Sequence, residues 1–207
     1  MSSSSSEVQN AHKAQTAEGV LPVIVERWSP RSFSERQVSN ADLVRVFEAA
    51  RWAPSSSNEQ PWQFIVGLKG TETHAKLTET LVGFNQSWAP NAAALILGLA
   101  HKTFSKNGNP NTYAMYDLGA ATAFLVLQAT ELGLHTHQMG GYNQAAAREA
   151  LAIPEEYALG AVIALGYRGE PGALANEQLL TRELAPRERK PLSEIVFSAW
   201  GEPAELG

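Results

Sequence analysis

The most informative stretch of this sequence is Ala53–Trp62, which reads APSSSNEQPW. Pro54 and Pro61 bracket three serines, an asparagine, a glutamate and a glutamine. A segment of this kind is stiff and presents many hydrogen-bonding groups, which suits the recognition of a polar heterocycle. A helix-to-strand turn rich in turn-forming residues explains the same composition equally well.

The residues on either side of this stretch predict a helix and a strand. Ser39 can cap a helix over Ala41–Ala53, which Pro54 ends. The apolar residues on one face of this helix are Leu43, Val46, Phe47 and Ala50. After the loop, Trp62–Leu68 is short, aromatic and β-branched, and is therefore predicted to be a strand.

The rest of the chain alternates irregularly between helical and strand patterns. Helices are predicted over Thr71–Leu81, Tyr113–Leu132 and Asn143–Leu151, and strands over Ala92–Leu99, Leu134–Gln138 and Ala158–Tyr167. Periodicity alone leaves a helix possible for the first of these strands. The tail from Gly169 is expected to be irregular, and its last part, Leu192–Trp200, carries apolar residues that need a cover. Because strands and helices do not alternate strictly, we expect an α+β sandwich.

Composition excludes several classes of protein. The chain has 207 residues, and its 16 basic and 21 acidic side chains give a formal net charge of −5, which argues against nucleic-acid binding and against a polybasic membrane-surface protein. The absence of cysteine excludes disulfide scaffolds and thiolate-bound metals, so electron transfer would require an organic cofactor. The longest apolar run, Leu118–Ala129, is too short to span a membrane. We expect a cytoplasmic protein with a disordered leader over residues 1–17.

Known catalytic and nucleotide-binding motifs are missing. The sequence contains neither a dinucleotide-binding glycine fingerprint nor a phosphate loop of the NTPase type. His135 and His137 lie two apart on a predicted strand, so both imidazoles could face one side. Because no third ligand completes a metal set, we interpret them as histidines on the strand surface.

Two other segments carry clustered cations. Glu26–Phe33 (ERWSPRSF) places two arginines and two serines around a proline, which suits a phosphate or a polyol chain, although an ordinary basic loop would look the same. Thr181–Lys190 (TRELAPRERK) has a local charge of +2. If the chain end folds back on Arg27 and Arg31, the combined site would hold a dianionic phosphate; otherwise this segment is a solvated tail.

Taken in chain order, Glu26–Phe33, Ala53–Trp62 and Thr181–Lys190 resemble the motifs of the nitroreductase family of flavin enzymes. The resemblance extends from Val20 to Trp200 and includes Tyr116–Gly119 and Met139–Tyr142. It implies a nitroreductase-like α+β fold, with a central mixed or antiparallel sheet surrounded by helices, in an intertwined homodimer. Residues 18–207 would then form a single FMN-binding domain whose C-terminal arm extends onto the partner subunit.

The resemblance also implies which residues contact FMN. Those expected at its phosphate and ribityl chain are Arg27, Trp28, Ser29, Arg31, Arg187 and Arg189. Those expected to border the flavin from the neighbouring subunit are Pro54, Ser55, Ser56 and Asn58. Met139, Gly140 and Gly141 would place a backbone N–H against flavin N5, and Asn85 would lie near the pyrimidine edge.

The activity implied is hydride transfer from NAD(P)H through flavin N5 to a small electron-poor acceptor such as a nitroaromatic, quinone or enal. No side chain is expected to act as catalyst, and neither nucleic acid nor membrane is an expected partner. Several family members place a lysine shortly after the asparagine, whereas Asn85–Trp88 carries no cation, which leaves the substrate open. The alternatives are a flavin store or sensor without turnover, and a family offshoot that fragments flavin or reductively dehalogenates an aromatic.

Overall fold

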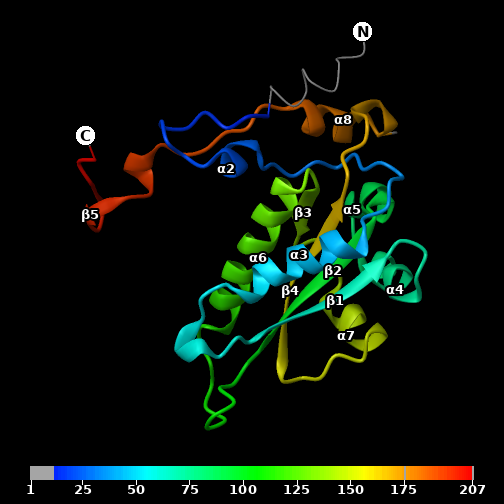
Figure 1. The fold of residues 1–207 in the computed structure, drawn as a ribbon, viewed down its shortest axis with the longest axis horizontal. Helices are drawn as coiled ribbons and strands as arrows, with labels where there is room; N and C mark the ends of the chain where they lie inside the picture. The colour runs from blue at the N-terminus through cyan, green and yellow to red at the C-terminus, as the bar shows by residue number, and fades with distance from the viewer. Residues whose placement is uncertain (1–11, 175, 207) are drawn as a thin grey trace.

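The fold is centred on a four-stranded sheet in the order β1-β2-β4-β3. In this computed structural model, which describes residues 12–174 and 176–206, every pairing in that sheet is antiparallel (Figure 1). The strands are β1 (Trp62–Leu68), β2 (Ala94–His101), β3 (His135–Met139) and β4 (Tyr157–Gly166). The expected α+β fold is confirmed, and its sheet is antiparallel rather than mixed.

Helices cover both faces of the sheet and form two separate cores. On one face pack α3 (Asn40–Arg51) and the long helix α6 (Ala114–Glu131). The other face carries α4 (Glu72–Thr80), the short α5 (Asn85–Trp88) and α7 (Gln144–Ala150). Strand β2 is therefore buried on both faces. Ala94 and Ile96 pack in the core under α3 and α6, and Leu95 and Leu97 pack in the core under α4, α5 and α7. A strand buried on both faces has no polar alternation, and its periodicity in the sequence was therefore ambiguous.

Local sequence signals fix most of the helix ends. The Ser39 side chain accepts a hydrogen bond from the Asp42 backbone N–H at 3.1 Å and caps α3, as expected. Gly133, with a φ of 72°, follows the last turn of α6. The predicted helices and strands between residues 39 and 167 are all present, with β1 at its predicted bounds and the other ends shifted by one or two residues.

The expectation that the whole tail from Gly169 is irregular was wrong, because part of it is helical. Residues Glu177–Leu184 form helix α8, whose N-cap Asn176 accepts from two backbone N–H groups. The remaining short elements are α2 (Pro22–Glu26), the 3₁₀ turns η1 (Ser56–Asn58), η2 (Ala89–Asn91), η3 (Pro171–Ala173) and η4 (Leu192–Glu194), and the strands β5 (Phe197–Ala199) and β6 (Glu202–Pro203). Helix α8 was missed because most of its side chains are polar and only Leu179 and Glu183 are buried.

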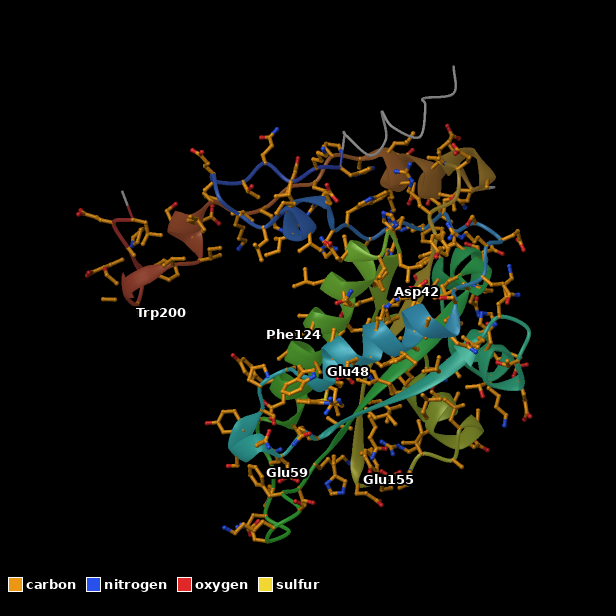
Figure 2. The ribbon with its side chains drawn as sticks, viewed as in Figure 1. Asp42, Glu48, Glu59, Phe124, Glu155 and Trp200 are labelled. Carbon is orange, nitrogen blue, oxygen red and sulfur yellow. The ribbon has the colours of Figure 1, made fainter. Side chains whose placement is uncertain are left out.

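The segment from His12 to α2 and the segment after α8 lie together on one side of the sheet. In Figure 1 the segment around α2 and the arm from η4 to β5 extend away from the sheet, side by side. His12, within the expected leader, is buried and stacks on Trp28, whereas residues 1–11 lie outside the described residues. Trp200, near the end of the arm, is 98% exposed (Figure 2). In the described part of the chain no helix is long and apolar enough to cross a membrane.

Candidate functional site

A cationic cavity lies between the loop after α2 and the segment after α8. Its volume is about 210 Å³, and its lining residues are His12, Arg27, Trp28, Ser29, Arg182, Ala185, Pro186, Arg187 and Arg189. Four guanidinium groups from segments more than 150 residues apart therefore contribute to one cavity. The chain end folds back on the N-terminal loop, which is the arrangement that a phosphate site would require. We call this cavity the cationic pocket.

The arginines of the cationic pocket are close enough to repel one another. Burial and then the charges of Arg187 and Arg189 lower the pKa of Arg27, and burial and then Arg189 lower that of Arg187. Among the described residues, no ion pair neutralises any of these three. Arg187 Nη1 instead donates to the carbonyls of His12 and Val25, at 2.9 Å each. A bound anion would relieve this repulsion and would accept charge-assisted hydrogen bonds.

A buried indole, that of Trp28, also lines the same cavity. The Trp28 ring stacks on His12 with centroids 3.8 Å apart and meets His135 edge-on at 6.3 Å. Its Nε1 is buried without a hydrogen-bond partner in the part of the chain that the structure describes. Buried N–H groups nearly always have a partner, so this donor marks Trp28 as a residue whose hydrogen bonding is incomplete without a further group.

The two strand histidines were wrongly expected at the surface. The loop that follows Arg27 covers that face of β3, so His137 Nδ1 lies 3.0 Å from the Pro30 carbonyl, to which it donates, and its ring packs on Trp88. Burial, the largest cause, lowers the pKa of both His135 and His137 to about 4, which keeps both imidazoles neutral at pH 7. No group of three or more metal-binding side chains occurs within the described residues. These two histidines lie under the loop that follows Arg27 and contact it through Pro30 and Trp28.

The residues expected near the flavin ring are only partly together. Asn85 Nδ2 and the Val82 backbone N–H both donate to the Gly141 carbonyl at 3.1 Å. A Cβ at Gly141 would lie 2.7 Å from Asn85 Nδ2, whereas one at Gly140 would meet open space. The Met139 side chain belongs to the hydrophobic core, so only its backbone could reach a ligand.

A cation, Arg182, does lie near Asn85–Trp88, the segment that has no lysine of its own. The Arg182 guanidinium carbon lies 5.2 Å from the centroid of the Phe84 ring, and Phe84 directly precedes Asn85. Arg182 also lines the cationic pocket. By contrast, Arg31 does not line that pocket, although its guanidinium is half-buried and its backbone N–H donates to Glu183.

The loop from Pro54 to Asn58 lies far from the cationic pocket in a single chain. Figure 1 shows it at one end of the molecule, in cyan, with α8 at the other end. The Ser56 backbone N–H donates to the buried carboxylate of Asp117 at 3.1 Å. Ser57, Asn58 and Gln60 all have φ between 53° and 55°, a region that residues other than glycine seldom occupy. Strained backbone of this kind is concentrated at functional sites.

Comparison with known proteins places these features in a family. The family model described as "Nitroreductase family" matches residues 24–87 and 69–167. The chain belongs to the nitroreductase family. This confirms the resemblance seen in the sequence, and the match includes the Arg27 loop, the Pro54–Asn58 loop and Gly141.

Relatives of this nitroreductase-family chain share most of its length. A protein of Archaeoglobus fulgidus named "Putative NADH dehydrogenase/NAD(P)H nitroreductase" is 38% identical over 154 residues, which cover 72% of this chain and 86% of that protein. A crystal structure described as an oxidoreductase containing FMN has a TM-score of 0.83 at 34% identity, covering 89% of this chain and 93% of its own. A structure from Desulfovibrio desulfuricans in complex with FMN has a TM-score of 0.70 at 26% identity, with coverages of 89% and 98%.

Two buried carboxylates in this nitroreductase-family site escaped the sequence analysis. Glu183 and Asp117 each lie within a segment that the sequence analysis singled out, but neither was predicted to be a site residue. Glu183 lies four residues after the apolar Leu179, a spacing that places both on one helix face. That spacing was the available signal, but it becomes useful only once α8 is known to be a helix.

Proposed function

We propose that this chain is an FMN-dependent oxidoreductase that passes a hydride from NAD(P)H to a small electron-poor acceptor such as a nitroaromatic, quinone or enal. The observation that carries the proposal is the cationic pocket, which gathers Arg27, Arg187 and Arg189 without a neutralising carboxylate among the described ion pairs. Family membership and the FMN found in related structures support the same cofactor.

The residues present fit the terminal phosphate of FMN. Guanidinium groups offer forked donors, and Ser29, whose hydroxyl accepts from Arg27 Nη1 at 3.3 Å, lines the same cavity together with Trp28. These donors converge on a single cavity. The sequence has no glycine-rich turn for a bridging pyrophosphate, which favours FMN over FAD.

Bound FMN would supply the redox chemistry, accepting a hydride at N5 and passing it to the acceptor. The chain's own residues bind and orient. Because a Cβ at Gly140 would meet open space, the backbone there leaves room for a ring to approach closely. Asn85 holds the neighbouring carbonyl of Gly141 in place, so the orientation of this turn is fixed before any ligand binds. No side chain is proposed as a catalytic acid or base.

We further propose that the working unit is a homodimer whose flavin sites combine both subunits. The Pro54–Asn58 loop and the cationic pocket lie at opposite ends of one chain, so both could contact one flavin only if they came from different chains (Figure 1). The arm leaves Leu192, Ile195 and Trp200 exposed. Exposed apolar residues in this number indicate an interface, and the second subunit would cover them.

The cofactor and the reaction can be tested on the purified protein. We expect heat to release FMN and not FAD, and NADH or NADPH to bleach the bound flavin anaerobically until an acceptor restores its colour. Recovery of mostly FAD would refute the phosphate assignment. Absence of bleaching with either nucleotide would favour a flavin store. Sedimentation is expected to give about twice the 22.4 kDa of one chain.

A further inference from the structure

The side chain of Glu183 is fully buried, at 0% exposure, in a helix whose surface is otherwise mostly polar. Both carboxylate oxygens accept hydrogen bonds from distant backbone: Arg31 N donates to Oε2 at 2.7 Å, and Ser32 N donates to Oε1 at 3.3 Å. These bonds join residues 152 and 151 positions apart. Burying a carboxylate is unfavourable unless it is well hydrogen-bonded, so a position of this kind has a specific role.

The two bonds fix one end of the loop that carries Arg27 and Ser29. Ser32 is also held from its other side, because its hydroxyl donates to the Glu170 carbonyl at 2.6 Å and its own carbonyl accepts from Gly169 N at 2.9 Å. The loop end is therefore determined by contacts to α8 and to the segment just before it.

The same helix leads directly to the second set of cations. Arg187 and Arg189 follow Glu183 by four and six residues and line the cationic pocket together with Arg27. Glu183 therefore links the segment that carries one set of arginines to the loop that carries the other.

If Glu183 acted through its charge alone, it would weaken the binding of a phosphate rather than support it. A negative side chain near the cationic pocket weakens its attraction for phosphate by Coulomb's law. The charged groups around Glu183 are Arg31 and Arg168, with His12 also close to its backbone. The benefit of a carboxylate here must therefore lie in where it holds the backbone.

We propose that Glu183 is a positioning residue that holds the Arg27–Ser32 loop in register with Arg187 and Arg189, so that both sets of cations reach one phosphate. The inference rests on the proposed binding of FMN. It assigns the specificity for a phosphorylated flavin partly to a side chain that does not itself line the cationic pocket.

The test compares Glu183→Gln with Glu177→Gln, which removes the same charge from an exposed position in the first turn of α8. Dissociation constants for FMN and for riboflavin, which lacks the phosphate, are measured by fluorescence titration of the full-length apoprotein. In E183Q we expect at least a tenfold loss of FMN affinity, about 1.4 kcal/mol, with riboflavin affinity changed by no more than about twofold. In E177Q we expect both constants to match the wild type.

Each alternative gives a different pattern. Tighter FMN binding in E183Q would mean that Glu183 acts through its charge, unchanged binding would mean that it has no role in the site, and an equal loss for both flavins would mean a general structural role; each of these results overturns the proposal. If the wild type binds riboflavin as tightly as FMN, the proposed function fails instead. Should E183Q not fold, hydrogen exchange of the wild type decides, because fast exchange at the Arg31 and Ser32 amides would contradict the two bonds.

Discussion

The loops Arg27–Ser32 and Pro54–Asn58, both expected at the flavin, are held in place in different ways. The first depends on distant parts of the chain, since its end is hydrogen-bonded to Glu183, 152 residues away, and its Pro30 carbonyl accepts from His137. The second is held close to its own position in sequence. Ser55 Oγ accepts from Gln60 N, two residues beyond the loop, at 3.0 Å, and a bond to a more distant residue runs from Ser56 N to Asp117.

The two loops therefore depend on different parts of the chain for their geometry. The geometry of the first loop follows the position of the C-terminal segment, so any change there alters the cationic pocket. The second loop is strained, with consecutive φ values of 55° at Ser57 and Asn58, and it is anchored to the first turn of α6 rather than to the C-terminal segment. We therefore expect changes in the first region to affect recognition of the phosphate, and changes in the second to affect recognition of the ring.

The largest effect is expected when the two regions are disrupted in different chains. One chain carries Arg187→Ala and Arg189→Ala, and the other carries Ser55→Ala, Ser56→Ala and Asn58→Gly. Neither variant alone should retain FMN. If each site combines the arginines of one subunit with the loop of the other, a mixed dimer has one intact site and should bind about half the wild-type amount of FMN. Absence of recovery in separately tagged, co-purified mixed dimers would place both regions of a site in one chain.

The sequence predicted these two regions unequally well. Around Pro54–Asn58, the cap at Ser39, the apolar face of α3 and the strand after Pro61 are local signals, and the structure follows them. The positive φ values were not foreseen, because serine and glutamine do not indicate left-handed backbone. Around Arg27 the site residues predicted from the sequence include Arg27, Trp28, Ser29, Arg187 and Arg189 of the cationic pocket, but not His12 or the contacts that support the loop. His135 and His137 looked like surface residues because burial of β3 depends on the covering loop, and α8 has too few apolar residues to show a helical period.

Removing the two C-terminal arginines alone should weaken FMN binding at least tenfold. Hydrogen bonds to charged groups contribute about 1.5–3 kcal/mol each, so the double variant loses more than the about 1.4 kcal/mol that corresponds to tenfold. Riboflavin binding should change much less, and the dependence of FMN affinity on salt should become shallower. Arg187 also donates to two backbone carbonyls, so Arg189→Ala is the cleaner single variant. Unaltered FMN affinity in the double variant would show that these arginines lie outside the site.

Acid should destabilise the first region through its histidines. Burial lowers the pKa of His135 and His137 to about 4 from the ordinary histidine value of 6.5, so the unfolded chain binds protons that the folded chain does not. Their contribution to stability is complete above pH 6.5 and is lost as the pH falls through 4, by roughly 2–3 kcal/mol for each imidazole. Urea unfolding between pH 7 and 4 should be less pH-dependent in His135→Gln/His137→Gln than in His101→Gln, a control at the far end of β2. Equal slopes would mean that the two imidazoles titrate as freely in the folded chain as in the unfolded one.

The smallest effect is expected in the second region, from Asp117→Asn. Asp117 is buried and accepts from Ser56 N at 3.1 Å, and the asparagine can keep one acceptor oxygen while it loses the charge. We expect a loss of about 1 kcal/mol in unfolding free energy, the size of one hydrogen bond weakened rather than removed. Because this bond positions the loop that is proposed to border the ring, affinity for FMN and for riboflavin should fall by the same few-fold factor, unlike the phosphate-selective loss expected for E183Q. The conservative exchange at the partly exposed Asp42 provides the control, with neither affinity altered. A loss confined to FMN in the Asp117 variant would contradict the division between phosphate and ring recognition, because it would make the second loop sensitive to a group that only the first is proposed to bind.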